Sequence, residues 1–305
     1  KNFSMIKKYA SLFFKGMAMG AADVVPGVSG GTIAFITGIY EEFISSLSSL
    51  NIKALQLVFR GQFSTFWNHI NGTFLAVLFA GIFTSILSLA SLLTYALEHY
   101  ETWVWSFFFG LVAASVWMVG RTVAKWNAAA VLSLIAGTVI AYLITIAPAT
   151  SGTTEPWYLI LCGALAICAM ILPGISGSFI LLLLGAYSTV LAAVADRDLL
   201  TIALIGIGAI LGLLSFTKAL KWIFNRYYSI TIALLSGFLL GSLNKLWPWK
   251  EVLTSFTKHA GTPKEEIVPL TVQNLPPGDH AMTALAFAIA GAVVVLGLEW
   301  AGKKK

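Results

Sequence analysis

The sequence predicts an all-α polytopic membrane protein built from two inverted repeats, each with a re-entrant broken-helix hairpin and three transmembrane helices. The first observation is composition: 58% of the 305 residues are hydrophobic and only 10% are charged, whereas a soluble domain carries about 25% charged residues. The second is that the apolar residues form runs of about 20, the length that crosses the hydrocarbon layer of a bilayer. The third is a Pro-Gly-x-Ser-Gly sequence that interrupts two such runs, at residues 26–30 and 173–177. Lipid must therefore be the main solvent of this chain.

Six apolar runs are uninterrupted and predict six full spans. We place them at 73–97, 103–124, 128–148, 200–223, 229–247 and 281–301. Two further apolar regions, 9–48 and 157–195, contain the Pro-Gly interruptions. On either side of each interruption lie roughly 16 to 18 residues, which suits half-helices that meet inside the membrane. We therefore expect each region to form a re-entrant hairpin.

Two connecting segments are expected to lie outside the hydrocarbon layer. In segment 49–71, four apolar residues fall on one face of a helix, which predicts a helix lying in the membrane interface. These residues are Leu55, Phe59, Phe63 and Phe66. Segment 248–280 is predicted to be an external loop, in which Thr262-Pro263-Lys264-Glu265 has the pattern of a helix start. The prolines Pro269, Pro276 and Pro277 predict irregular structure for the rest of the loop.

The distribution of positive charge predicts the orientation of the chain. If each hairpin returns to its starting side, 14 of the 19 Lys and Arg residues fall on the side of the two chain ends and five fall on the other. The positive-inside rule then places both termini in the cytoplasm. The net charge of +6 is a topology signal on this interpretation, and no nucleic-acid partner is expected.

An internal repeat divides the chain into residues 1–148 and 149–305. A shift of 147 residues superimposes the two breaks and the segments after them, placing Pro26 on Pro173, Gly27 on Gly174, Ser29 on Ser176, Gly30 on Gly177, Gly38 on Gly185 and Tyr40 on Tyr187. A shift of 127 residues aligns the later spans, placing Gly81 on Gly208, Ser88 on Ser215, Tyr100 on Tyr227, Gly110 on Gly237 and Ser115 on Ser242. Three full spans separate the two hairpins, so the second copy starts on the opposite side of the membrane from the first. Inverted repeats with discontinuous helices are a transporter architecture, with the substrate site near the midplane.

Each break has the features of an anion site. Proline ends a helix, and the half-helix after it begins with backbone N–H groups that lack partners and with the positive end of its dipole. Glycine lets a ligand approach this backbone closely, and serine and threonine add hydroxyl donors. We predict that a phosphate or carboxylate is bound by Ser29, Gly30, Gly31, Thr32, Ser176, Gly177 and Ser178, with Pro26, Gly27, Pro173 and Gly174 forming the breaks. The alternative is a pair of kinked helices with serine caps and no ligand.

Three charged or titratable residues complete the predicted site. Arg121 follows a long apolar run and either reaches inward to a phosphate or anchors its span in the headgroup layer. Asp23 lies three residues before Pro26, where the second repeat has Met170. Its carboxyl group either carries a proton or accepts N–H bonds from the turn. His99, at the external end of a span, is either a surface residue or a pH-sensitive gate. No catalytic residue, metal or cofactor is expected.

The string Gly20-Ala-Ala-Asp23-Val-Val-Pro26-Gly27-Val-Ser29-Gly30-Gly31-Thr32 and its partner Leu172-Pro173-Gly174-Ile-Ser176-Gly177-Ser178 carry a family resemblance. The chain resembles a bacterial family once known only as a domain of unknown function, the undecaprenyl-phosphate translocases of the PopT type, over essentially its whole length. The resemblance implies a non-enzymatic transporter of the bacterial inner membrane that moves the lipid carrier undecaprenyl phosphate from the outer to the inner leaflet. The carrier would then be reused for peptidoglycan and other envelope polymers. Its expected partners are this lipid and the membrane lipids, and a homo-oligomer is an open alternative.

Three other functions stay open from the residues alone. A half-helix site suits chloride or a carboxylate as well as a phosphate, which would make the chain a small-anion transporter or channel. Gly27-Val-Ser29-Gly30 matches the nucleophile pattern of an intramembrane serine protease, which also needs a base beside the serine. The four histidines, His69, His99, His259 and His280, all fall in predicted loops or at span ends. A scaffold without transport is disfavoured by the duplicated Gly/Ser motif.

Overall fold

The structure is a computed structural model that describes residues 2–25, 28–258, 266–278 and 280–303. It is mostly helical, with one two-stranded sheet in its described part. In chain order the elements are α1 (Asn2–Val24), α2 (Gly30–Ile36), α3 (Tyr40–Ser48), α4 (Ile52–Phe59), α5 (Phe63–His69), α6 (Gly72–His99), α7 (Glu101–Gly120), α8 (Ala128–Ile146), α9 (Pro156–Ile171), α10 (Gly177–Leu183), α11 (Tyr187–Ala195), α12 (Leu199–Arg226), α13 (Tyr228–Leu246), β1 (Lys250–Lys258), β2 (Glu266–Asn274) and α14 (Ala281–Lys303).

The six predicted spans are all helices, and they correspond to α6, α7, α8, α12, α13 and α14. Among the described residues, five of them are long and apolar enough to cross a membrane, while α14 contributes the shorter apolar stretch Ala281–Gly297. Helix α7 ends at Gly120, earlier than the predicted boundary at residue 124. A connection follows until Asn127 starts α8 by accepting a hydrogen bond from the backbone N–H of Ala130. The architecture is that of a multi-pass membrane protein.

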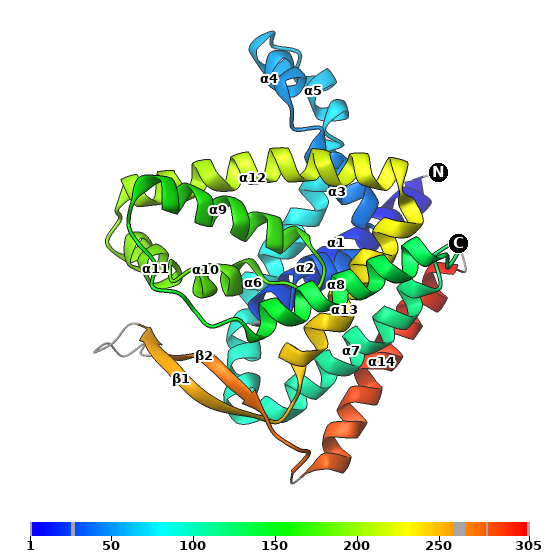
Figure 1. The fold of residues 1–305 in the computed structure, drawn as a ribbon. Coiled ribbons are helices and arrows are strands. Elements are labelled where there is room, and N and C mark those ends of the chain that lie inside the picture. The colour runs from blue at the N-terminus through cyan, green and yellow to red at the C-terminus, as the bar shows by residue number, and fades with distance from the viewer. Residues whose placement is uncertain (1, 26–27, 259–265, 279, 304–305) are drawn as a thin grey trace.

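Apart from α4 and α5, the helices of the two halves follow the same order, and three pairs match in length. Helices α2 and α10 are each seven residues long, α3 and α11 nine, and α6 and α12 28. Helix α1 packs against α6 as α9 packs against α12 (Figure 1). The remaining helices pair across the halves, so that α7 packs against α14 and α13 against α8. Matched pairs of this kind are what a duplication produces, and the opposite orientation of the two copies stays a prediction.

Glycine contacts repeat this correspondence residue by residue. A Cβ on Gly81 of α6 would collide with the carbonyl oxygen of Phe13 of α1, and a Cβ on Gly208 of α12 would collide with that of Ile160 of α9. The shifts of 127 and 147 residues relate these two pairs. Small residues allow helix backbones to approach closely in membranes. In both halves, a glycine of the long helix lets it contact the backbone of the first hairpin helix.

The arm after each break differs from the prediction. We expected one half-helix, but the chain forms two short helices at a bend, α2 with α3 and α10 with α11. Each short helix before the bend ends at a glycine with positive φ, Gly38 at +71° and Gly185 at +63°. Glycine adopts this left-handed conformation without a steric penalty and commonly ends helices there. The α10–α11 pair is bent by 109°, and counting it as one broken span would raise the five candidate spans to six within the described residues.

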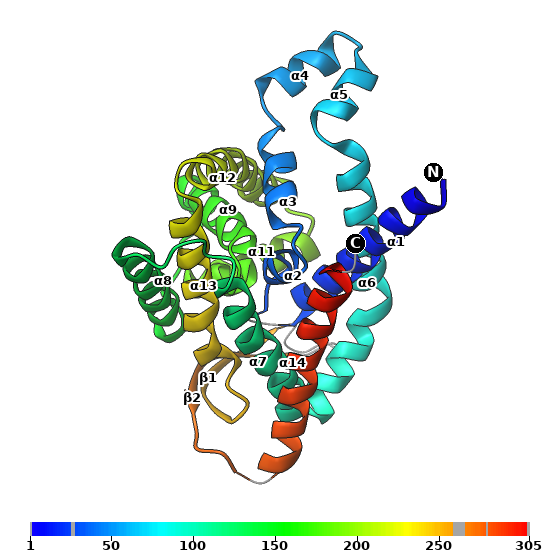
Figure 2. The ribbon, with the colours of Figure 1, turned by 90° about the vertical axis from the view of Figure 1, so that its right-hand side faces the viewer.

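The segment between the first hairpin and α6 also differs from the prediction. It forms two helices, α4 and α5, instead of one, because the chain turns at Gly61 with φ +69°. The pair projects from the helical bundle (Figure 2). Its apolar side chains are largely exposed, with Phe59 at 81% and Phe63 at 66%. Its position in the membrane interface stays a prediction.

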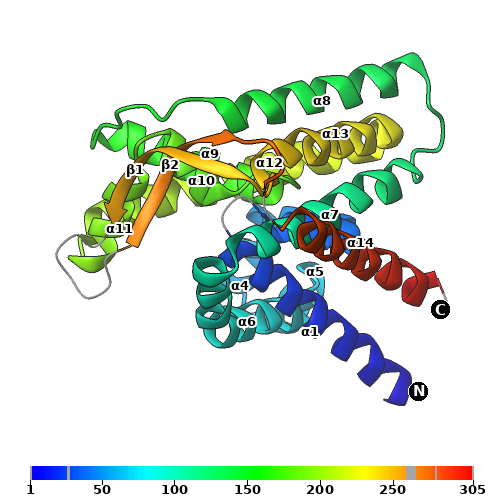
Figure 3. The same cartoon turned by 90° about the horizontal axis from the view of Figure 1, so that it is seen from below.

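The predicted external loop contains an antiparallel hairpin, so the expectation of irregular structure after α13 was wrong for the strands. β1 and β2 pair from Lys250 opposite Asn274 to Lys258 opposite Glu266. Pro269 lies opposite Ser255, next to the shifts in register, where a residue without an N–H is tolerated. The predicted helix start at Thr262–Glu265 lies outside the described residues. Seen from below, the hairpin lies across the α9–α11 region (Figure 3), at the end of the molecule away from the two labelled chain ends (Figure 1).

Candidate functional site

The two breaks lie against each other. The first break lies between α1 and α2, and the second lies between α9 and α10. The hydroxyl of Ser29 donates a 3.0 Å hydrogen bond to the carbonyl of Met170. In the opposite direction, the N–H of Gly174 donates a 2.8 Å bond to Oγ1 of Thr32. Side chains of the first predicted motif therefore bond directly to the backbone of the second.

Tyr40 adds a third hydrogen bond between the two breaks, and we call these three bonds the interlock. Its hydroxyl donates to the carbonyl of Ile171 at 3.1 Å, and its side chain is only 2% exposed. In the sequence, Tyr40 stood out only as the repeat partner of Tyr187. Its role was missed because the sequence does not show that the hydroxyl bonds to a carbonyl 131 positions away. Ile171 is the last residue of α9, so its carbonyl has no partner further along that helix. The tyrosine thus satisfies a helix-end carbonyl in the other half.

The first break is closed by protein groups. Ser29 is 1% exposed and Thr32 is fully buried. The Oγ of Ser29 accepts a 3.1 Å bond from the N–H of Gly31, and a Cβ added to Gly31 would lie 2.6 Å from the carbonyl oxygen of Ile171. A phosphate could reach these predicted ligands only after the two breaks part. Pro26 and Gly27, which were predicted to form this break, lie outside the described residues.

Asp23 occupies the position of an anion at the start of α2. Its Oδ1 accepts a 2.6 Å bond from the N–H of Gly30, the first residue of that helix. A carboxylate is stabilised there by the free N–H groups and the helix dipole. Of the two predicted roles, the structure shows the hydrogen bond to the turn, while proton carriage stays a prediction. The first break therefore already holds a negative group.

The second break has a more open arrangement. Ser176 begins α10 but makes no side-chain cap, and its hydroxyl lies 2.9 Å from that of Ser178, which is exposed. Gly174 has φ +87°, and a Cβ there would lie 2.9 Å from both the carbonyl oxygen of Phe238 and the hydroxyl of Ser242. The turn therefore packs closely against α13. Its two serine hydroxyls bond each other, with Ser176 buried and Ser178 exposed.

A lysine that the sequence did not mark as a site residue lies beside this second break. Lys245, in the last turn of α13, places its ammonium 4.4 Å from the ring centroid of Phe179, the neighbour of Ser178. Lys250 of β1 donates a 2.5 Å bond to the carbonyl of Lys245 and lies 3.5 Å from the ring centroid of Trp105. Burial, with the charge of Lys245 as a second cause, lowers the pKa of Lys250 to about 7. The sequence presented both lysines only as the minority charges of the external side.

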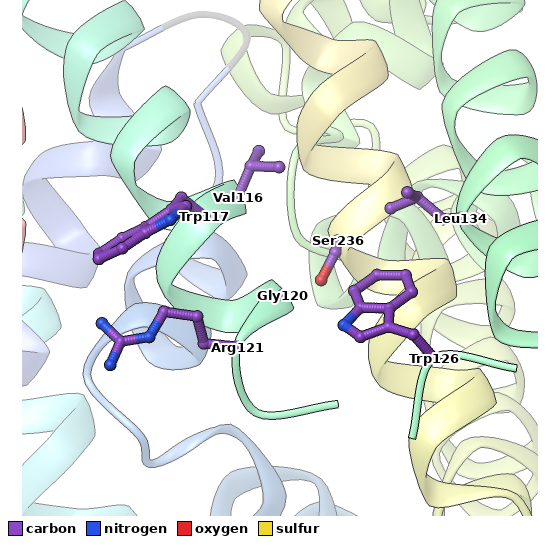
Figure 4. A pocket seen from close by; sticks show the side chains of 7 residues that line it. All are labelled: Val116, Trp117, Gly120, Arg121, Trp126, Leu134 and Ser236. Atoms are coloured by element: carbon purple, nitrogen blue, oxygen red, sulfur yellow. The ribbon is translucent and has the colours of Figure 1, made fainter. Parts of the chain in front are cut away.

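Arg121 and His99 lie elsewhere. Arg121 borders a cavity of about 310 Å³, but its guanidinium lies 4.6 Å from the ring centroid of Trp117 and points away from Ser236 (Figure 4). No contact between Arg121 and either break is found in the described part of the chain. The exposed His99 stacks on Tyr95 and shares a 3.0 Å contact with its carbonyl. Both predicted roles, phosphate ligand and gate, stay predictions.

Two alternatives, a serine nucleophile at Ser29 and a metal site, can be compared with the described residues. The Ser29 hydroxyl is directed at a backbone carbonyl, and a protease would need it directed at a base. Groups of three or more His, Cys, Asp or Glu side chains that could hold a metal ion are absent from the part of the chain that the structure describes. What the arrangement offers is a set of N–H and O–H donors, with two lysines close to one end.

Comparisons with known proteins agree on one family. The model of the undecaprenyl phosphate translocase-like family matches residues 19–264. A Vibrio cholerae protein named polyprenyl-phosphate transporter is 45% identical over 302 residues, which covers 95% of this chain and 96% of the relative. A Staphylococcus aureus protein of the same name is 33% identical over 252 residues, which covers 77% and 84%. No solved structure gives a significant match. The chain therefore belongs to the undecaprenyl phosphate translocase-like family, whose curated relatives are named as transporters and not as enzymes.

Proposed function

We propose that this chain moves undecaprenyl phosphate, a polyprenyl monophosphate, from the outer to the inner leaflet of the bacterial inner membrane, where the carrier is reused in envelope synthesis. Two relatives named polyprenyl-phosphate transporter support the substrate class. Five long apolar helices support a multi-pass location. The excess of Lys and Arg on the side of the chain ends supports cytoplasmic termini.

The observation that carries the proposal is the interlock of the two breaks. The Ser29 hydroxyl and the Gly174 N–H are donors whose present acceptors belong to the opposite half. Phosphate oxygens accept bonds from the same kinds of donor, and more strongly because they are charged. Parting of the breaks would therefore expose donors that a headgroup can satisfy, so that the substrate replaces a contact between the halves.

The packing suggests which parts move. Helices α1 and α6 are joined by the close contact at Gly81, and α9 and α12 by the one at Gly208. The first helix of each hairpin thus packs closely against a long helix of its own half. The two breaks are joined by hydrogen bonds that first-half side chains donate (Ser29, Tyr40) or accept (Thr32). We propose that one half rocks against the other and carries the headgroup across, as in transporters built from inverted repeats. The polyprenyl tail stays in lipid, where it needs no polar partner.

Leaflet exchange of labelled undecaprenyl phosphate in proteoliposomes tests the proposal. Vesicles with the protein should equalise the label between leaflets faster than protein-free vesicles. Labelled undecaprenol, which has the same tail without the phosphate, should not be accelerated. A chloride-sensitive dye inside the same vesicles reports the competing function. If the dye responds while lipid exchange stays at the protein-free rate, the chain is a small-anion transporter and the proposal is wrong.

A further inference from the structure

A second cavity lies under the β-hairpin, and its lining includes Lys245, the lysine beside the second break. It has a volume of about 380 Å³ and is bounded by the end of α8, the end of α13 and both strands. This volume falls within the range of small-ligand pockets, about 300–1,000 Å³. It is enough for a headgroup and the start of a chain, but not for a long polyprenyl tail. The cavity therefore suits the polar end of a lipid whose tail remains outside.

The polar lining of this cavity consists of neutral side chains and one cation. The amide of Asn244 donates to the hydroxyl of Thr145 at 2.8 Å. The amide of Asn274, at the end of β2, donates to the side-chain oxygen of Asn244 at 2.9 Å and to its backbone carbonyl at 3.1 Å. These bonds fix the amide groups in place and use both N–H groups of Asn274, so that one N–H of Asn244 is left for a ligand. Lys245 supplies the positive charge, and no carboxylate borders the cavity among the described residues.

The ammonium of Lys245 has no anion of its own within the described residues. It carries three N–H donors, and the group that it contacts there is the face of Phe179. The side chain is half-buried. A partly buried ammonium without a charged partner is unfavourable, so a bound anion would satisfy it. The carboxylate nearby, on Glu101, instead accepts a 3.1 Å bond from the indole N–H of Trp105 and faces Lys250.

Beside each break lies one charged residue whose counterpart in the other half is methionine, and these two charges have opposite sign. The shift of 147 residues pairs Asp23 with Met170, and the shift of 127 residues pairs Lys245 with Met118. In the first half the charge is negative, and it is already bonded to the N–H of Gly30. In the second half the charge is positive and lies in the wall of a cavity. An anionic ligand is therefore expected in the second half.

We infer that the cavity under the β-hairpin is a docking site for a phosphomonoester headgroup, with Lys245 as its binding cation and the second amide N–H of Asn244 as a neutral donor. Leu253 and Val272 of the hairpin provide the apolar wall for the first carbon units of the tail. Because the hairpin lies opposite the chain ends (Figure 1), this would be the place where the lipid is received from the outer leaflet. That last step rests on the proposed function, whereas binding at the cavity does not.

Binding of farnesyl phosphate, a short polyprenyl monophosphate, to the purified protein in nanodiscs tests the inference. Lys245→Met, which installs the residue found at the matching position of the first half, should weaken binding about 10- to 100-fold, as expected for loss of a charge-assisted hydrogen bond. Lys245→Arg keeps the charge and should stay close to the wild type. Lys218→Met removes an exposed cation of α12 and is the matched control. Equal affinity of the wild type and Lys245→Met for farnesyl phosphate would overturn the inference.

Two further comparisons are needed. One distinguishes a lipid headgroup from free phosphate as the ligand, and the other distinguishes failure of the docking site from failure of the proposed function. Inorganic phosphate should bind more weakly than farnesyl phosphate, and farnesol should not depend on Lys245; tighter binding of inorganic phosphate would replace the lipid headgroup with free phosphate as the ligand. A thermal unfolding midpoint near that of the wild type shows that Lys245→Met is folded. If wild-type proteoliposomes exchange undecaprenyl phosphate but Lys245→Met binds normally, the docking site is wrong and the proposed function stands. If binding depends on Lys245 but no exchange occurs, the site stands and the function is wrong.

Discussion

The first and second breaks share one sequence motif but differ in what surrounds it. At the first break, Ser29 and Thr32 are buried, and the carboxylate of Asp23 bonds to the start of α2. At the second, Ser176 is also buried, but Ser178 is exposed and the ammonium of Lys245 lies 4.4 Å from the ring centroid of the neighbouring Phe179. A duplicated motif therefore does not make two equivalent sites. Side chains at the first copy make the hydrogen bonds between the halves, and the second copy lies beside Lys245.

The largest effect is expected from a methyl group placed in the interlock of the two breaks. A Cβ at Gly31 would lie 2.6 Å from the carbonyl oxygen of Ile171 and 3.1 Å from that of Met170, and neither backbone atom can move freely. Gly31→Ala should destabilise the protein by about 1–3 kcal/mol and slow lipid exchange at least tenfold. Thermal unfolding and the proteoliposome assay measure the two effects. Gly206→Ala is the control, because a Cβ there meets nothing within 4 Å; equal behaviour of the two variants would contradict the close contact.

An effect of similar size on stability is expected from removing one hydrogen-bond acceptor between the two breaks. Thr32→Val keeps the shape of the side chain but leaves the N–H of Gly174 without its partner, at a cost of about 1–3 kcal/mol. Ser178→Ala at the second break should change stability by less than about 0.5 kcal/mol, because the side chain is exposed. Chemical denaturation in detergent measures both. If Ser178→Ala were the more damaging, the assignment of locked and open breaks would be reversed.

Two variants of Asp23 separate its two predicted roles. Asp23→Ala removes the acceptor of the Gly30 N–H and should cost about 0.5–2 kcal/mol, the value of a helix N-cap. Asp23→Asn keeps an acceptor oxygen and loses only the charge. If Asp23 serves as a cap, Asp23→Asn should retain exchange at every pH tested. Loss of exchange in a stable Asp23→Asn protein would instead support proton carriage.

The smallest effect concerns Lys250, the second lysine near the open break. Its pKa is lowered from 10.5 to about 7 by burial and by Lys245, so between these pH values the unfolded chain binds more protons than the folded one. Stability should therefore rise with pH in this window and fall as the pH drops to 7, by at most about 1 kcal/mol from pH 7 to 8. Unfolding midpoints measured across this range should show the slope in the wild type and lose it in Lys250→Met. If Lys250→Met kept the same pH dependence of its unfolding midpoint, that dependence would belong to another titratable group.

The spans and the repeat could be predicted because both depend on local properties of the sequence. An apolar run of 20 residues has few alternatives to a membrane helix, and the recurrence of Pro-Gly-x-Ser-Gly needs no structure to be seen. The bends at Gly38 and Gly185 were missed although both glycines were aligned in the repeat. Glycine is common inside membrane helices, so its left-handed conformation shows only when the chain path is known. The β-hairpin was missed because Pro269 argued against a strand more strongly than its neighbours argued for one.

By itself the sequence determined that the chain is a multi-pass membrane protein, and it predicted that the two halves correspond and that a Pro-Gly pair breaks each one, since these follow from hydropathy, spacing and the chemistry of proline. Only the tertiary structure decided which groups at the breaks are engaged. The bond between Ser29 and Met170 joins residues 141 positions apart, and the cavity beside Lys245 forms only when the β-hairpin covers the ends of α8 and α13. Contacts of this range depend on how helices pack, and packing depends on all the side chains at once.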